Sequence, residues 1–347
     1  MTAPHPLVTA ARRLADDVLA PHAEQVDQGE VPAGHLAEIR RSGLLGLNAP
    51  REYGGAAAPG AVARETAEIL AGACCSTWFV QAQHHTPVLT LARSESPARE
   101  RLLGRLATGE LLSGVAYAHL RTHPRIPVRA TRDRGGWRFD GTVPWYTGWG
   151  LNDVLLLAGV TDADEALFAF AQARDQPGLR ASPPMRLAAL TAARTVSLHL
   201  DGLWLPEEAV ALRTPHHTWS TTDRLKTVNT NPAVFGITEA ALTLLDETTA
   251  PPLRARLTDV RREAYALADE AAPHEHLAER LALRTQAYEV MQATTTAAVV
   301  TGGGRSMLLT NKAQRLAREA LFLMVQAQTT ESRGSHLKAL VSQQVRE

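Results

Sequence analysis

The chain has 347 residues, of which 45% are hydrophobic, which is enough for a sizeable core divided among two or three packed units. Lysine plus arginine and aspartate plus glutamate both number 36, so a zero net charge gives no support for a nucleic-acid or anionic-membrane partner. No stretch approaches the ~18 apolar residues of a membrane span, and the N-terminus lacks the apolar core of a signal peptide. Cys74 and Cys75 are adjacent, and neighbouring residues rarely form a disulfide, so we expect reduced thiols and a cytoplasmic protein.

Residues 1–112 have the hydrophobic period of helices. In the first stretch, one stripe of a helix is formed by Leu7, Ala11, Leu14 and Val18. Four more helical stretches follow, and the proline and glycines of NAPREYGG break the chain between two of them. This segment is therefore predicted to be an N-terminal helical domain.

Residues 113–212 change to the pattern of short strands. The stretches GWRFDGTV, DVLLLAGV, EALFAFAQ and RTVSLHLDGLWLP are apolar and are bounded by Gly, Asp or Pro. In the last of them Val196, Leu198 and Leu200 alternate with polar residues, as in a strand with one buried face. The segment DRGGWRF predicts a hairpin in which Gly135 and Gly136 supply positive φ. We expect a small middle β domain.

Residues 213–347 return to the helical period. Four long helical stretches, which begin near Asn231, Leu253, Glu279 and Asn311, predict a C-terminal helical bundle. The preceding pair His216 and His217 is interpreted as part of a solvated linker. The fold class is therefore α+β, with a β domain between two helical domains.

The order of these segments and several motifs resemble the acyl-CoA dehydrogenase superfamily over nearly the whole chain. The motifs are GLLGLNAPREYGG, LLSGVAYAHL, a Gly-x-x-x-Trp-x-Thr segment at Gly141, Trp145 and Thr147, VSLHLDGLWLPEEAV, and TGGGRSMLLTNKAQRLAREALFL. The resemblance implies an N-terminal helical domain, a β-barrel-like middle domain and a C-terminal four-helix bundle. It also implies a homodimer or homotetramer formed through that bundle.

The same resemblance implies a flavin against the aromatic segment VPWYTGW. Trp145 would flank the isoalloxazine ring, and Thr147 would hydrogen-bond near its N5 atom. A planar ring favours aromatic faces, and N5 favours a nearby donor that tunes hydride acceptance. The alternative is that these aromatic residues fill a seam between the β domain and the helices. We favour that packing role for Tyr146 and Trp149.

The resemblance implies further cofactor contacts, although this chain carries only some of the family's residues for them. Tyr117 and His119 lie in the stretch that would pass the other end of the ring, and Gly302 and Gly303 match part of the turn that receives the pyrophosphate. The loop that usually holds phosphates is LRTHPRIPV here, in which Leu120 replaces a threonine. FAD is therefore the expected cofactor, with FMN or a reduced flavin as alternatives.

The family's usual catalytic base is missing from both of its places. A dehydrogenase of this family removes a proton α to a thioester carbonyl with a glutamate in a Tyr-Glu-Gly-Thr segment, and counting back from Arg333 places Gln326 there. An amide cannot act as a general base. Other members place the glutamate at the start of the first C-terminal helix, near which Lys226 stands. Glu331 would substitute for Gln326 only if the register slipped.

The segment QAQHHTP carries two adjacent histidines, His84 and His85, on one broad helix face with Gln81. No third ligand stands at a helpful spacing, so we expect no metal site. The superfamily also contains two-component flavin monooxygenases, in which histidines near the ring handle flavin hydroperoxide and substrate protons; either histidine would suit this role. The alternative is that both only pack between helices.

Together these observations predict a flavin-dependent oxidoreductase that acts on an acyl thioester or a small metabolite. The first alternative is a two-component flavin monooxygenase, which would need a flavin reductase as partner. The second is a non-catalytic binding or scaffold relative that has lost both the flavin and the base.

Overall fold

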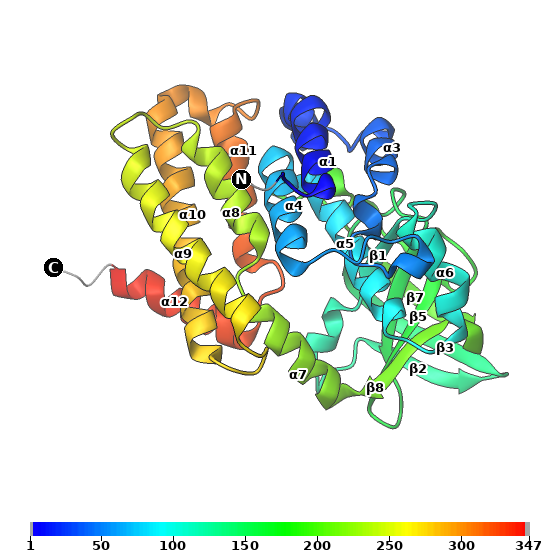
Figure 1. Ribbon diagram of the computed structural model, residues 1–347. Helices are drawn as coiled ribbons and strands as arrows, with labels where there is room; N and C mark the ends of the chain where they lie inside the picture. The colour runs from blue at the N-terminus through cyan, green and yellow to red at the C-terminus, as the bar shows by residue number, and fades with distance from the viewer. Residues whose placement is uncertain (1–2, 344–347) are drawn as a thin grey trace.

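The computed structural model describes residues 3–343, in which helices, a sheet and more helices follow one another along the chain (Figure 1). The chain ends 1–2 and 344–347, which belong to the predicted N- and C-terminal domains, lie outside the described residues. The N-terminal helices are α1 (Pro6–Leu14), α2 (Ala23–Gln28), α3 (Ala33–Arg41), α4 (Gly60–Ala73), α5 (Cys75–Ala92) and α6 (Pro97–Ala107). The predicted helical start of the chain is confirmed.

The middle of the chain forms one eight-stranded sheet. Its strands are β1 (Ser113–Ala116), β2 (Val128–Asp133), β3 (Gly136–Tyr146), β4 (Val154–Val160), β5 (Glu165–Gln172), β6 (Leu179–Ala181), β7 (Val196–Pro206) and β8 (Val210–Pro215). The order is β6-β7-β3-β2-β4-β5-β8, and β1 pairs in parallel with β4. In β7 the side chains of Val196, Leu198 and Leu200 are buried and those between them are not, so the predicted alternation is confirmed.

The β2–β3 hairpin is confirmed, but its turn differs from the prediction. Positive φ angles occur at Arg134 (46°) and Gly135 (77°), whereas Gly136 already belongs to β3. Two consecutive positive φ angles are typical of the type I′ turn, whose twist matches that of the paired strands. Farther along β3, Gly141 has φ 129°, and a Cβ there would lie 2.0 Å from the carbonyl oxygen of Pro127. Only glycine therefore fits this position of the Gly-x-x-x-Trp-x-Thr segment.

The C-terminal part is helical, and α8 to α11 lie side by side as a bundle (Figure 1). Its helices are α7 (His216–Thr227), α8 (Pro232–Leu242), α9 (Ala250–Glu270), α10 (Leu277–Gly302), α11 (Lys312–Val325) and α12 (Thr330–Gln343). The interpretation of His216 as a solvated linker residue is wrong. His216 begins α7, is buried, and its Nε2 lies 3.0 Å from the carbonyl oxygen of Leu120.

The N-terminal helices and the bundle share one hydrophobic core, and two glycines bring them into backbone contact. A Cβ on Gly72 of α4 would lie 2.7 Å from the carbonyl oxygen of Gly236 in α8. A Cβ on Gly236 would lie 2.0 Å from the carbonyl oxygen of Glu68. Because any side chain would force the helices apart, the α4–α8 crossing depends on both glycines.

A buried ion-pair network also joins the N-terminal helices to the bundle. Arg315 of α11 donates to both carboxylate oxygens of Glu319 at 2.9 Å and to Glu24 of α2 at 3.2 Å. One turn along, Arg318 pairs with Asp27. Burial alone would lower the pKa of Arg315, but the Glu319 carboxylate beside it raises that pKa above its usual range. Arg315 therefore stays charged inside the protein.

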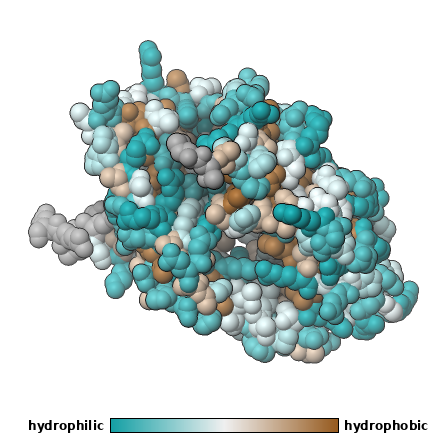
Figure 2. All heavy atoms as spheres, viewed as in Figure 1, coloured by the Kyte–Doolittle hydropathy of each residue, from teal (hydrophilic) through white to brown (hydrophobic). Residues whose placement is uncertain are grey.

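Among the described residues, no helix has the length and apolar character that crossing a membrane requires. The domain boundaries after residues 112 and 212 stay predictions, since β1 begins at Ser113 and β8 runs on to Pro215. Figure 2 shows mainly hydrophilic side chains on one face, with hydrophobic ones around a hollow between the bundle and the β-rich lobe.

Candidate functional site

One large aromatic side chain at the end of β3 is left uncovered. Trp145 is 54% exposed, whereas its neighbour Tyr146 is completely buried and accepts a hydrogen bond from Asn152 at 3.0 Å. The ring of Trp149 packs edge-on against that of Tyr146, with centroids 6.0 Å apart. The packing role predicted for Tyr146 is confirmed. The hydroxyl of Thr147 lies 3.0 Å from that of Thr195, which fixes its position at the end of the strand.

Tyr117 and His119 follow β1 but differ in their surroundings. Tyr117 packs edge-on against Phe168 and against Trp219 of α7, with centroids 5.7 and 6.3 Å apart. His119 is buried, and its Nε2 lies 3.0 Å from the carbonyl oxygen of Ala158 in β4. Because its ring is held by the sheet, a flavin contact at His119 would have to come from the backbone.

We expect acid to destabilise the fold through His119. Burial lowers the pKa of His119 from 6.5 to about 4, so the unfolded chain takes up the proton first as the pH falls. The stabilisation is complete above pH ~6.5 and declines toward pH ~4, where about 3 kcal/mol is lost. Urea unfolding across this range measures the decline, and His119→Gln should make it shallower. A variant with the same decline as the unsubstituted protein would contradict this account.

The loop that holds phosphates in the family has a different chemistry in this chain. Leu120 is buried, and Arg121 donates two hydrogen bonds to Asp223 of α7, at 2.7 and 2.8 Å. Gly303 has φ 58° and open space where a Cβ would lie, whereas a Cβ at Gly302 would lie 2.1 Å from the hydroxyl of Ser306. A planar flavin ring fits the uncovered face of Trp145. Its phosphates do not fit Leu120–Arg121, because that arginine is already paired.

Gln326, which we predict to stand at the family's glutamate position, contacts the start of the first bundle helix. Gln326 follows α11, and its Oε1 accepts a hydrogen bond from Asn231, which caps the start of α8, at 3.3 Å. Ala327 has φ 51°, a conformation that favours glycine, and it stands where the Tyr-Glu-Gly-Thr segment has its glycine. This agreement supports the register that assigns Gln326. Lys226, predicted to stand near the start of the first bundle helix, lies in α7, and Asn231 caps that start.

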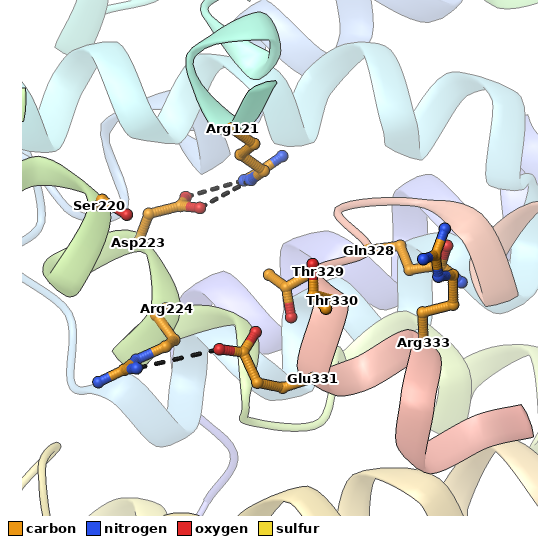
Figure 3. Close-up of a pocket in the computed structure, with 9 residues that line it drawn as sticks. All are labelled: Arg121, Ser220, Asp223, Arg224, Gln328, Thr329, Thr330, Glu331 and Arg333. Atoms are coloured by element: carbon orange, nitrogen blue, oxygen red, sulfur yellow. Dashed lines mark hydrogen bonds and ion pairs between the residues drawn. The ribbon is translucent and has the colours of Figure 1, made fainter. Parts of the chain in front are cut away.

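A charged pocket of about 340 Å³ is lined by residues of α7 and by the segment that begins at Gln328, two residues beyond Gln326. Figure 3 shows Arg121 facing Asp223 on one side, and Arg224 of α7 reaching Glu331 of α12, 3.9 Å away. Glu331 thus faces an arginine at this pocket, five residues beyond Gln326. The lining consists of Arg121, Ser220, Asp223, Arg224, Gln328, Thr329, Thr330, Glu331 and Arg333.

A second, largely apolar pocket of about 190 Å³ lies between α4, α5 and the start of α8. Asn231 lines this pocket and is hydrogen-bonded to Gln326, which lies two residues before Gln328 of the charged pocket. Its lining consists of Leu44, Leu47, Asn48, Ala63, Thr66, Ala67, Leu70, Trp78, Gln81, Ala82, His85, Asn231 and Pro232. This lining contains no aspartate or glutamate, and therefore no carboxylate.

The histidine pair of α5 is divided between two environments. His84 is completely buried, and its Nδ1 accepts a hydrogen bond from the backbone of Ser113 at 3.0 Å. His85 lines the apolar pocket, where its Nε2 lies 2.6 Å from the amide nitrogen of Gln81. Burial lowers the pKa of His84 to about 3 and that of His85 to about 4, so both are neutral at pH 7. Of the two described pockets, the apolar one is lined by His85 and neither is lined by His84.

Within residues 3–343, no group of three His, Cys, Asp or Glu side chains is placed to hold a metal ion. The sequence does not predict two contacts of the site: the hydrogen bond between Asn231 and Gln326, and the pairing of Arg121 with Asp223. The Asn-Pro pair at 231–232 is a typical helix-start signal, which would have marked Asn231 as the first bundle position. No local signal marks Asp223, since its partner is 102 residues away.

Comparison with known proteins agrees with this architecture. Residues 5–110 match the family model of the acyl-CoA dehydrogenase N-terminal domain. A probable acyl-CoA dehydrogenase fadE25 of Mycobacterium leprae (strain TN) is 29% identical over 213 residues, which cover 57% of this chain and 53% of the relative. The chain thus matches only about half of that relative's length. A dibenzothiophene monooxygenase of Rhodococcus erythropolis is 32% identical over 161 residues, 45% of this chain and 38% of the relative.

Solved structures extend the likeness to the whole fold. A glutaryl-CoA dehydrogenase from Mycobacterium smegmatis, solved in complex with FADH2, superposes with a TM-score of 0.76 at 19% identity. The superposition covers 98% of this chain and 95% of that one. Residues 5–110 thus match the acyl-CoA dehydrogenase N-terminal domain, and the chain as a whole shares the fold of this solved structure.

Proposed function

We propose that the protein is a flavin-dependent oxidoreductase that acts on an acyl thioester or a related small metabolite. The observation that carries this proposal is the apolar pocket, whose wall includes Asn231 hydrogen-bonded to Gln326, together with a charged pocket that is lined from Gln328 onward. A thioester has the matching parts: an apolar acyl group, a reactive carbonyl and a polar carrier. A pocket that combines apolar walls with a few converging polar groups is typical of a small-molecule site.

FAD is the cofactor that we propose, held with its ring against Trp145. The glutaryl-CoA dehydrogenase that shares the fold contains the reduced form of this cofactor. Thr147 lies two residues farther along, where its backbone and hydroxyl would stand beside the ring. When bound, the flavin would supply the hydride or electron acceptor that no side chain provides. The chain's own part is to orient the ring and to exclude water.

Flavin binding gives the direct test. The purified protein, titrated with FAD, FMN and their reduced forms, should bind at least one of them with a visible absorption change. Trp145→Ala should weaken this binding about 5-fold, because ring stacking on an aromatic face contributes about 1 kcal/mol. The thermal midpoint should change little, since Trp145 is exposed.

Trp204→Ala is the matched control, since Trp204 is a second exposed tryptophan of the same sheet, on β7. It should leave flavin affinity unchanged. Equal losses in both variants would show that Trp145 is not the ring contact. If no flavin form binds, the oxidoreductase proposal fails and the non-catalytic alternative gains support.

Oxygenation by reduced flavin is the second candidate reaction. It is favoured by the described lining of the apolar pocket, which offers His85 but no carboxylate to remove an α-proton. A flavin reductase would then be the partner. An acyl thioester that bleaches bound flavin without oxygen would identify a dehydrogenase. Absence of bleaching, together with binding of reduced flavin only, would identify the oxygenase.

We further propose a cytoplasmic homodimer or homotetramer. Four apolar side chains at the end of α10 and in the turn to α11 are each more than half exposed, and a cluster of this kind usually marks an interaction surface. They are Val300, Met307, Leu308 and Leu309. Cys74 and Cys75 are buried and free, as is typical of proteins in a reducing compartment.

A further inference from the structure

We infer that the apolar pocket restricts the substrate to a compact, uncharged group, a single ring or a chain of about six carbons, and that Trp78 sets this limit. The inference rests on the proposed function, because it treats this pocket as the place of the substrate's apolar part. It goes beyond that function by naming the size and polarity of the group.

The main walls of the pocket are formed by two helices. On each helix the lining side chains are spaced so that they lie on one face. Ala63, Ala67 and Leu70 of α4 recur at intervals of three and four residues, as do Trp78 and Ala82 of α5. The alanines leave the space, because larger residues at the same positions would occupy it. The cavity is therefore a property of a few small side chains rather than of loosely packed helices.

The volume limits what fits. The cavity measures about 190 Å³. A dry cavity of about 150 Å³ lined by aliphatic and aromatic side chains holds benzene, so this pocket has room for one ring and little more. Leu44, Leu47 and Leu70 of its walls are each at most 2% exposed and are packed in the core shared with the bundle. Trp78, 5% exposed, is the largest of the wall residues.

The polar atoms of the lining define the group's orientation. Asn231 lines the pocket and is hydrogen-bonded to Gln326, so the reactive part of the substrate should point toward this amide pair. His85 and Gln81 pair with each other at 2.6 Å, and the described lining contains no acidic or basic side chain that is charged at neutral pH. A charged end group would be buried without a counter-ion, which folded proteins avoid.

Binding of small apolar probes tests the limit without any need for flavin or turnover. By isothermal titration calorimetry, benzene should bind the unsubstituted protein, and naphthalene should bind at least 10-fold more weakly. Ala67→Leu should fill the cavity and weaken benzene binding at least 10-fold. Ala61→Leu, on the exposed face of α4, should leave it unchanged. Trp78→Phe should bring naphthalene affinity to within a few-fold of that for benzene.

Each result separates this inference from the proposed function. If naphthalene binds as tightly as benzene, or if Ala67→Leu has no effect, the size limit is wrong even where thioesters reduce the flavin. If the probes behave as expected and no thioester reduces the flavin, the size limit of the pocket is supported and the proposed reaction is wrong. In a series of linear acyl-CoA probes, equal affinity for ten-carbon and six-carbon chains would also overturn the limit.

Discussion

Gln326→Glu is expected to give the protein α-proton abstraction from an acyl thioester, at a rate about 10²- to 10⁴-fold above that of the unsubstituted chain. The substitution changes an amide into a carboxylate with the same reach, at the position that we predict to be that of the family's base. Asn231 would donate its amide hydrogen to the new carboxylate, as it now does to Gln326 at 3.3 Å. The start of α8 beside it favours a negative charge.

Two measurements report this gain separately. Exchange of the thioester's α-protons with deuterium measures the base alone, and anaerobic flavin bleaching measures the complete half-reaction. Gln328→Glu is the matched control, because it adds the same charge two residues farther on, in the charged pocket. Equal gains in both variants, or no gain in Gln326→Glu, would mean that Gln326 does not occupy the base position.

Glu319→Gln is expected to lower the free energy of unfolding by about 3–5 kcal/mol. The substitution removes the carboxylate that receives two hydrogen bonds from Arg315, and both side chains are at most 2% exposed. Arg315 would then keep its charge in the core with only Glu24, 3.2 Å away and partly exposed, as a partner. Denaturant unfolding, analysed at equal m-values, measures the loss.

The double variant Arg315→Met with Glu319→Leu distinguishes two causes of lost stability: a buried charge without its partner, and the loss of packing. Replacing a complete buried pair by apolar residues of similar volume is often close to neutral. We therefore expect the double variant to regain most of the stability that Glu319→Gln loses. A double variant less stable than the single one would show that the pair itself stabilises the contact between α2 and α11.

The sequence predicts most of the fold because the relevant signals are local and repeated. The alternation of Val196, Leu198 and Leu200 identifies β7, and the period of three and four residues identifies α10 and α11. The hairpin between β2 and β3 follows from its glycines, although the turn is displaced by one residue. His216 was misplaced because α7 has little apolar periodicity, and only packing against β5 and the Leu120 loop buries this histidine.

The site is predictable only in part, because its contacts join distant segments. Counting along a motif places Gln326, and the positive φ of Ala327 supports that count. The Asn231–Gln326 contact spans 95 residues and the Arg121–Asp223 pair spans 102, so no local pattern contains them. The exposure of Trp145 and the burial of Tyr146 differ although the residues are neighbours, because successive side chains of a strand point to opposite faces.

The backbone contact between Gly72 and Gly236 has a consequence for how selectivity can evolve. Their helices, α4 and α8, also carry walls of the apolar pocket, and they already touch main chain to main chain. The walls therefore cannot approach further, and separating them would open the core. New preferences for larger or smaller molecules should arise in discrete steps, by exchange of single wall residues such as Ala67 or Trp78, and not by gradual movement of the helices.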